Sequence, residues 1–167
     1  MKGIGNSTTS SFDIETKKEA HMVLLSLCET VAMRLRNYKY CTRLVSIGVK
    51  TSDSVYYSHQ HKFDVPIDST KKIYEYTKAL FDEVWKDEKI RHLGVRVSEL
   101  CENDMIQLSI FESKDNEKQK ALDKAIDKIR IKYDSRSIIR GCFINTEIKP
   151  LTGGVGEGDY PIMSSIL

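Results

Sequence analysis

The sequence lacks an excess of charge of either sign. It has 26 lysine and arginine residues against 24 aspartate and glutamate residues in 167 positions, which gives a net charge of +2. This balance excludes a histone-like basic tail but allows one basic face, because net charge averages over all sides of a protein. With 40% hydrophobic and 30% charged residues, the composition is that of an ordinary folded protein. The length fits one domain with a short appendage.

Long apolar runs are also missing, so no segment is expected to span a bilayer. The first residues lack the apolar core of a secretory signal and the pattern of a transit peptide. The four cysteines, Cys28, Cys41, Cys101 and Cys142, form no CxxC pair. Such cysteines without a secretory signal are typical of a reducing compartment, and we expect a cytoplasmic protein. A zinc site built from them stays an open alternative that their spacing does not favour.

Motifs for catalysis are absent too: there is no Ser/His/Asp arrangement, no HExxH and no paired carboxylate motif. The glycine-rich stretch at 153–158 lacks the Lys-Ser/Thr ending of a phosphate loop, which favours a flexible tail. His59 and His61 are two residues apart in a predicted strand, but the sequence places no carboxylate or cysteine beside them. Two exposed side chains are therefore favoured over a metal site.

The first hundred residues alternate between strand and helix patterns. Thr16 and Glu19 form a capping-box pattern before an apolar stripe of period three to four, which predicts a long helix. Two period-two segments flank the turn at 52–54 and predict a hairpin. The predicted elements are a short strand at 8–12, a helix at 17–37, strands at 41–51 and 55–64, a helix at 71–86 and a strand at 90–100.

This order predicts an α+β fold, β-α-β-β-α-β, in which two helices cover one face of a four-stranded antiparallel sheet. The pattern leaves the strand order open. The other sheet face is polar, provided that each strand keeps its register, because a slip of one residue exchanges the faces. The residues assigned to this polar face are Ser46, Lys50, Ser58, Gln60, Lys62, His92, Arg96 and Ser98. The same alternation puts Arg91 beside Leu93 on the helix-covered face.

The character of the sequence changes after residue 100. A charged linker at 101–116 contains one apolar cluster at 107–111. A third helix is predicted at 117–133, with one apolar stripe among dense lysine and aspartate, and a short strand is predicted at 137–144. The stripe consists of Leu122, Ile126, Ile129 and Tyr133. We therefore expect a domain at 1–100, a linker at 101–116, a helix-and-strand unit at 117–145 and a tail at 146–167.

The polar sheet face has two interpretations. Lysine, arginine and hydroxyl side chains suit the phosphate backbone of nucleic acids. A solvated antiparallel sheet face without a function is the alternative, and composition alone favours it.

Two segments change this balance. Lys2-Gly3-Ile4-Gly5-Asn6-Ser7 resembles the opening of the little finger domain of Y-family, lesion-bypass DNA polymerases. The segment at 89–98, Lys-Ile-Arg-His-Leu-Gly-Val-Arg-Val-Ser, is similar to the last strand of that domain, and the order of the elements between them matches. The resemblance covers residues 1 to about 100. Gly3 departs from it, because serine is usual at that position.

The resemblance implies that the domain holds primer-template duplex DNA, largely through phosphate contacts from its sheet. It implies that Lys2, residues around 5–8, Arg91, His92 and Arg96 approach the DNA backbone. Arg91 can do so only if the strand twists or bulges, or if the side chain reaches around the sheet edge. Together with the polar face, the expected DNA-binding residues are Lys2, Ser7, Thr8, Lys50, Ser58, Lys62, Arg91, His92, Arg96 and Ser98.

The cluster Gln107-Leu108-Ser109-Ile110-Phe111 resembles the pentapeptide with which bacterial polymerases hold the sliding clamp. Leu108, Ile110 and Phe111 would fill an apolar cleft, and Gln107 would form hydrogen bonds beside it. Anchoring of the linker onto the domain is the alternative. The position in a charged stretch after the DNA-binding domain favours the clamp.

The family's metal-binding carboxylates belong to a palm domain that this sequence does not contain. We therefore expect a carboxy-terminal fragment that has no cofactor and polymerises nothing, with magnesium in the absent palm domain. The expected partners are duplex DNA, bound without sequence preference, and the sliding clamp. The competing hypothesis is a regulatory or protein-interaction module that oligomerises through its sheet, since this architecture serves unrelated roles.

Overall fold

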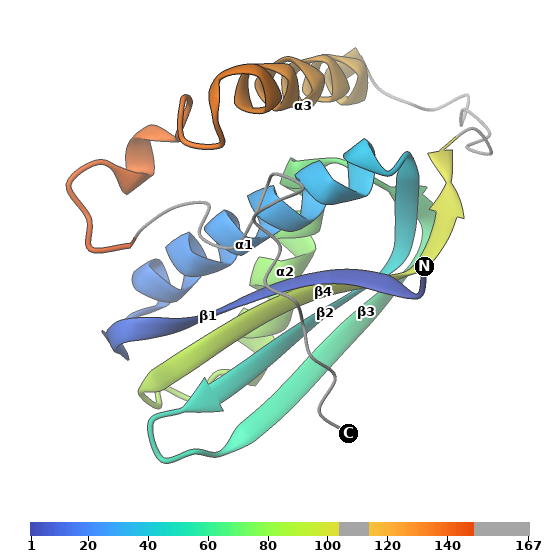
Figure 1. The fold of residues 1–167 in the computed structure, drawn as a ribbon. Coiled ribbons are helices and arrows are strands. Elements are labelled where there is room, and N and C mark those ends of the chain that lie inside the picture. Colours follow the sequence, from blue (N-terminus) through green and yellow to red (C-terminus); the bar gives the residue numbers. More distant parts are fainter. Residues whose placement is uncertain (104–113, 149–167) are drawn as a thin grey trace.

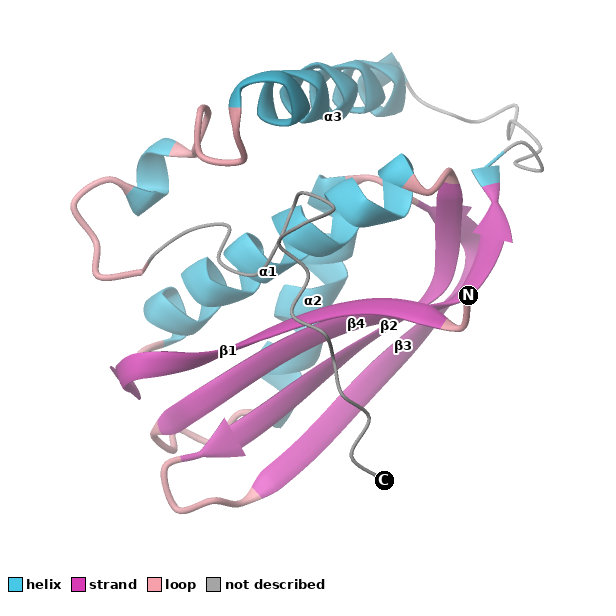
Figure 2. Ribbon diagram, in the orientation of Figure 1, coloured by secondary structure: helices cyan, strands magenta, loops and turns pink. Residues whose placement is uncertain are grey.

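The computed structural model describes residues 1–103 and 114–148. Four antiparallel strands form one sheet, and helices α1 and α2 cover one of its faces, as predicted (Figure 1, Figure 2). A third helix, α3, lies on the side of α1 away from the sheet (Figure 1). The elements are β1 (Gly3–Ile14), α1 (Lys17–Asn37), β2 (Tyr40–Thr51), β3 (Tyr56–Ile67), α2 (Thr70–Val84), β4 (Ile90–Glu102), α3 (Lys114–Tyr133) and a short 3-10 helix (Gly141–Phe143).

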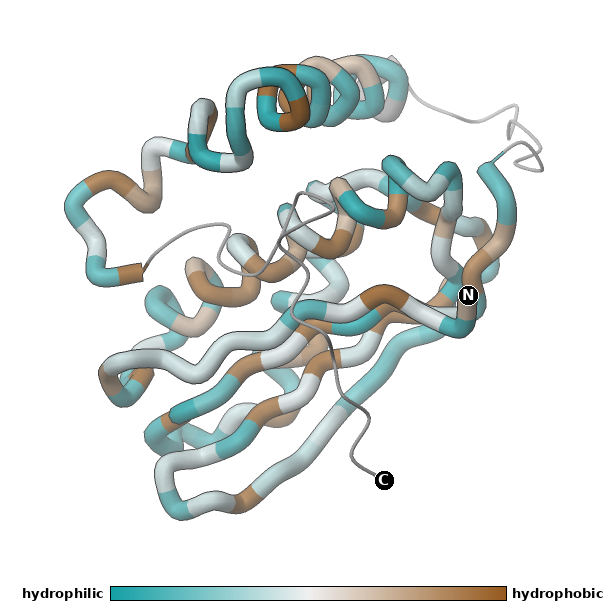
Figure 3. Tube along the Cα trace, in the orientation of Figure 1, coloured by the Kyte–Doolittle hydropathy of each residue, from teal (hydrophilic) through white to brown (hydrophobic). Residues whose placement is uncertain are grey.

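The strands lie in the order β1-β4-β2-β3, so the last strand is inserted between the first two. Each neighbouring pair is antiparallel. Both β-α-β connections therefore skip one strand: α1 joins β1 to β2 across β4, and α2 joins β3 to β4 across β2. The central strands, β2 and β4, place alternate apolar residues under the helices (Figure 3).

Helix α1 begins with the predicted capping box. The Thr16 hydroxyl accepts from the Glu19 N–H, and the Glu19 carboxylate accepts from the Thr16 N–H. Leu24, Leu27 and the rest of the apolar stripe are buried against the sheet. Full burial of one leucine stabilises the fold by about 2 kcal/mol, so this face holds the helix in place.

Cys28 is a core residue. Its side chain is fully buried, and its thiol donates to the Thr77 hydroxyl over 3.5 Å. Burial raises the pKa of this thiol to about 12. A thiol of this kind behaves as a small hydrophobe.

Arg91 occupies a β-bulge, which corrects its placement on the helix-covered face. Lys50 pairs with His92 and Thr51 pairs with Ile90, so Arg91 is one extra residue on β4. Ile90 takes the buried position at 0% exposure, and the Arg91 side chain is exposed, 3.6 Å from the Asp13 carboxylate. A bulge changes the phase of the alternation, which a period-two pattern cannot anticipate.

The predicted strand at 137–144 is wrong. This segment forms turns and the short 3-10 helix, with local hydrogen bonds from the Phe143 N–H to the Arg140 carbonyl and from the Ile144 N–H to the Gly141 carbonyl. Its apolar residues Ile139 and Ile144 are exposed, so they do not supply the burial that a strand would need. The first strand, in contrast, is longer than predicted: β1 begins at Gly3, five residues before the predicted strand at 8–12.

The cluster at 107–111 and the tail at 149–167 lie outside the described residues. Among the residues that the structure describes, no helix is long and apolar enough to cross a membrane.

Candidate nucleic-acid interface

The uncovered side of the sheet, called the open face below, carries its side chains in four rows that cross all four strands. Residues paired across antiparallel strands point to the same face, so the strand register defines each row. From β1 to β3, the rows are Gly3, Ser98, Leu44 and Lys62; Gly5, Arg96, Ser46 and Gln60; Ser7, Gly94, Gly48 and Ser58; and Thr9, His92, Lys50 and Tyr56.

This register brings most of the predicted site residues together. Seven of them share the open face: Ser7, Lys50, Ser58, Lys62, His92, Arg96 and Ser98. Lys2 is exposed immediately before β1. Arg91 stands at the bulge, paired with Asp13.

Thr8 is placed differently. It pairs with Leu93, which is fully buried beneath the helices, so its side chain is on the other side of β1 from Ser7. There it lines a small groove with Val23 and Ser26 of α1. An edge strand places such a residue between the two faces of the sheet.

Glycines hollow the centre of the open face. Gly48 and Gly94 are paired on the two central strands, in a depression of about 720 Å³ that spans the sheet. A Cβ on Gly48 would lie 2.8 Å from the Tyr56 hydroxyl oxygen, and one on Gly94 would lie 3.2 Å from Cβ of Ser7. Glycine here therefore lets the neighbouring side chains close in and lets a ligand approach the backbone.

Gly3 makes room for Arg96. A Cβ on Gly3 would lie 3.1 Å from Nε of Arg96 and 2.8 Å from the carbonyl oxygen of Val97. The arginine side chain thus crosses from β4 over β1, into space that a serine would fill. Glycine in place of the family's usual serine at position 3 therefore leaves the room that the Arg96 side chain occupies.

The fixed positive charge of the open face is carried by Arg96 and Lys50. Both side chains are exposed, and neither forms an ion pair with the residues that the structure describes. Lys62, in contrast, pairs with Glu99 at 2.7 Å. Exposed pairs of this kind are weak, so Lys62 can exchange Glu99 for another anion.

The surroundings of His92 favour the neutral form of its imidazole. Burial, together with the nearby positive charge of Lys50, lowers the pKa of the imidazole. Nδ1 of His92 lies 2.9 Å from the Thr9 hydroxyl oxygen, so these residues of the same row are hydrogen-bonded. His92 offers a phosphate a hydrogen bond from a neutral ring rather than a charge.

The histidines and cysteines considered as metal ligands have other contacts in the structure. His59 lies 3.3 Å from the Glu83 carboxylate, and His61 stacks on Tyr76 with ring centroids 5.1 Å apart. Within residues 1–103 and 114–148, no three His, Cys, Asp or Glu side chains are grouped so that they could hold a metal ion. The four cysteines are all free thiols.

Sequence reasoning missed two polar side chains of the open face, those of Thr9 and Tyr56. Tyr56 has the same parity as Ser58, Gln60 and Lys62, so the alternation of that strand was a usable signal. For Thr9 the sequence offered no such signal, because its place on the open face depends on the pairing of β1 with β4.

The model of the impB/mucB/samB family C-terminal domain matches residues 1–110, and the chain belongs to this family. Among curated relatives, DNA polymerase IV of Clostridium acetobutylicum is 40% identical over 150 residues, which cover 89% of this chain and 38% of the relative. DNA polymerase IV 2 of Bacillus subtilis is 34% identical over 144 residues, 84% of this chain and 34% of the relative. The chain spans little more than a third of the length of these polymerases.

Solved structures share the fold. The little finger domain of PolIV, in a complex with the beta-clamp processivity factor, has a TM-score of 0.51 and 19% identity, covering 65% of this chain and 98% of that domain. A post-insertion binary complex of Dbh DNA polymerase has a TM-score of 0.53 and 17% identity, covering 60% of this chain and 29% of the polymerase. The predicted resemblance is confirmed: this is the little finger fold of Y-family polymerases.

Proposed function

We propose that the open face binds duplex DNA through its phosphate backbone, as the little finger of a Y-family translesion polymerase. The observation that carries this proposal is the convergence, around the glycine depression, of hydroxyl groups and of cations that form no ion pair within the described part of the chain. Arg96 and Lys50 supply charge, and Ser7, Ser46 and Ser58 supply hydrogen bonds. Phosphate recognition uses these groups.

The chemistry of the face supports binding without sequence preference. Base reading needs a helix or ribbon that enters a groove, whereas this surface is a shallow sheet. Its polar and cationic character also speaks against burial in a self-interface, because copies related by two-fold symmetry would bring Arg96 and Lys50 toward their equivalents. The proposal therefore favours DNA over the oligomerising module.

In the proposal, residues 107–111 bind a sliding clamp. Support comes from the apolar pentapeptide in a charged stretch and from the related little finger whose structure is a complex with a beta-clamp processivity factor. Magnesium ions would be held by a palm domain in the part of the polymerase that this chain does not span. The chain itself would need no cofactor, polymerise nothing and act in the cytoplasm.

A salt titration of DNA binding tests the open face. Affinity for a short labelled duplex should fall steeply with salt, since each neutralised phosphate contributes about 0.9 to the logarithmic slope. The double variant Arg96→Ala/Lys50→Ala should bind more weakly and lower the slope by about two.

The matched control is Lys71→Ala/Lys78→Ala, which removes two exposed lysines of α2 on the helix side. Its affinity should equal that of the parent. Equal losses of DNA affinity in both double variants would show that positive charge anywhere on the domain is enough for binding. That result would contradict the proposed role of the open face.

A further inference from the structure

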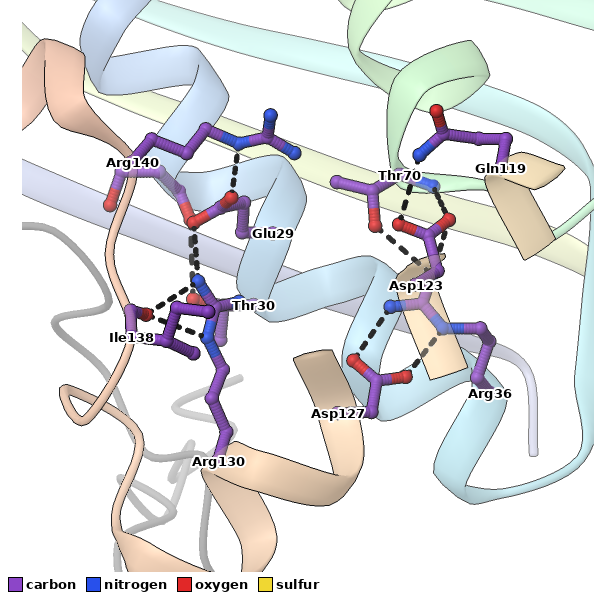
Figure 4. Close-up of polar contacts among 11 residues, drawn as sticks. Glu29, Thr30, Arg36, Thr70, Gln119, Asp123, Asp127, Arg130, Ile138 and Arg140 are labelled. Carbon is purple, nitrogen blue, oxygen red and sulfur yellow. Dashed lines mark hydrogen bonds and ion pairs between the residues drawn. The ribbon is translucent and has the colours of Figure 1, made fainter. Parts of the chain in front are cut away.

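Helix α3 is attached to the domain by charged groups (Figure 4). The first cluster is centred on Arg36 of α1, which binds Asp127 through two hydrogen bonds, from Nε at 2.6 Å and from Nη2 at 2.9 Å. Nη1 of Arg36 lies 3.5 Å from Asp123, whose carboxylate also accepts the Thr70 N–H at the start of α2. One arginine thus joins α1 and α3 beside the start of α2.

The second cluster is centred on Glu29, whose side chain is 2% exposed. Arg130 of α3 donates to this carboxylate over 3.1 Å, and Arg140 pairs with its other oxygen. Arg130 also donates to the Ile138 carbonyl, so the buried charges are partnered (Figure 4). Buried charges with full sets of partners define a specific position more than they add stability.

These clusters determine which side chains of α3 face the domain and which are exposed. Its described aspartates, Asp123 and Asp127, turn inward to Arg36, whereas Lys118, Lys124, Lys128 and Lys132 are exposed. The apolar stripe that the sequence indicates stays largely uncovered: Leu122 is 51% exposed, Ile129 37% and Tyr133 65%. Of the twelve exposed large apolar residues in the described chain, six lie between residues 117 and 148, so the uncovered apolar surface is concentrated in this unit.

The outer face of α3 is defined here by Leu122, Ile129 and Tyr133 with the neighbouring exposed lysines Lys118, Lys128 and Lys132. We propose that it is a second contact for the protein that binds residues 107–111, and that this partner meets it with an apolar patch bordered by carboxylates. The inference rests on the proposed function, in which that partner is a β-clamp processivity factor. Apolar anchors bordered by opposite charges are the usual pattern of a protein interface.

Chain length places such a partner beside α3. Residue 111 is three residues before Lys114, a reach of at most about 11 Å. Leu122 is eight residues into the helix, about 12 Å along its axis. A protein bound at 107–111 is therefore within reach of the first turns of α3.

The position of α3 allows DNA and this partner to bind together. The open face is on one side of the sheet, and α3 lies beyond α1 on the opposite side (Figure 1). Two other possible occupants fit this face less well. A second copy would set lysine against lysine, and a nucleic acid would leave Leu122 and Ile129 without apolar partners.

The test measures binding of this chain to the β-clamp processivity factor of the same organism, by surface plasmon resonance at two salt concentrations. The variant Leu122→Glu/Ile129→Glu should weaken binding about tenfold or more. Lys118→Glu/Lys132→Glu should weaken it and reduce its salt dependence. The controls are Val65→Glu, on an exposed apolar residue of β3, and Lys78→Glu, on α2; both should bind like the parent.

A motif variant, Leu108→Ala/Phe111→Ala, separates this inference from the proposed function. If the motif variant loses binding and both α3 variants bind like the parent, the second contact is refuted and the clamp motif stands. If the motif variant binds like the parent, the proposed clamp binding fails and the inference fails with it. Self-association of the parent that Leu122→Glu/Ile129→Glu abolishes, or loss of DNA affinity in that variant, also overturns the inference. Circular dichroism of every variant confirms that the fold is intact.

Discussion

Gly3 lies directly beneath Arg96: a Cβ at this glycine would be 3.1 Å from Nε of the arginine and 2.8 Å from the carbonyl oxygen of Val97. The second distance involves backbone, which can yield only if β1 moves away from β4. The first residue of the sheet edge and the main cation of the open face therefore depend on each other.

Gly3→Ser should destabilise the domain and reduce its affinity for DNA. The added side chain separates β1 from β4 and displaces Arg96, and overpacking of this kind costs about 1–3 kcal/mol. Urea denaturation measures the free energy of unfolding. Gly141→Ala is the control, because a Cβ there meets nothing within 4 Å, and it should leave stability nearly unchanged. Equal stability of Gly3→Ser and the parent would contradict the packing described here.

Arg36→Met should release α3 while leaving the sheet folded. The substitution leaves Asp123 and Asp127 without their arginine, and the loss of one member of a partly buried pair costs roughly 2 kcal/mol of docking energy. This corresponds to about a thirtyfold faster amide exchange in α3, measured by hydrogen exchange and mass spectrometry.

The comparison for this variant is Lys118→Met, which changes an exposed residue of the same helix. It should leave exchange in α3 unchanged. Unaltered protection of α3 in Arg36→Met would mean that the charge cluster does not hold the helix. Simultaneous loss of protection in β2 and β4 would mean that α3 is not a separable unit.

Lys50→Met should raise the pKa of His92 toward its ordinary value. Burial lowers this pKa first, and the positive charge of Lys50 lowers it further. Only the second cause is removed by the substitution. An NMR titration of the His92 ring protons measures the change, and Lys62→Met serves as the control because Lys62 is on β3 and pairs with Glu99.

The lowered pKa of His92 also makes the stability of the fold depend on pH, in a predictable direction. The folded state binds a proton at His92 less readily than the unfolded chain, whose imidazole titrates near about 6.5. The contribution of His92 is therefore fully present above that pH and is lost as pH falls toward the lowered pKa of the folded state. DNA acts in the opposite direction, since phosphate favours the charged ring, so binding should strengthen as pH falls through this window. A His92→Gln variant should show neither effect.

Much of the domain at 1–100 was predictable because its signals are local. The capping box at Thr16 and the turn at 52–54 each fix a short stretch of backbone without reference to distant residues. The alternation along β2 correctly separated Val45 and Ile47 from Ser46 and Lys50, because the pleat of a strand has a period of two wherever no bulge occurs.

The same kind of signal misplaced Arg91 and left the attachment of α3 open. A bulge shifts the phase of a strand through its pairing with a neighbour, and only the pairing of Lys50 with His92 and Thr51 with Ile90 reveals it. In α3, the apolar stripe is the most visible pattern, yet the buried residues are Asp123 and Arg130. Their partners, Arg36 and Glu29, are about ninety to a hundred positions away in the sequence.

The sequence by itself determined the helices and strands of the first hundred residues, the polar side of the sheet and membership of the little finger family, because these follow from local periodicity and short motifs. Only the tertiary structure decided the strand order β1-β4-β2-β3 and the rows of the open face, and only it turned Asp123, Asp127 and Arg130 of α3 inward. Each of these features depends on contacts between residues that are far apart in the sequence. Such contacts are determined by the packing and strand pairing of the whole chain rather than by the pattern of any one segment.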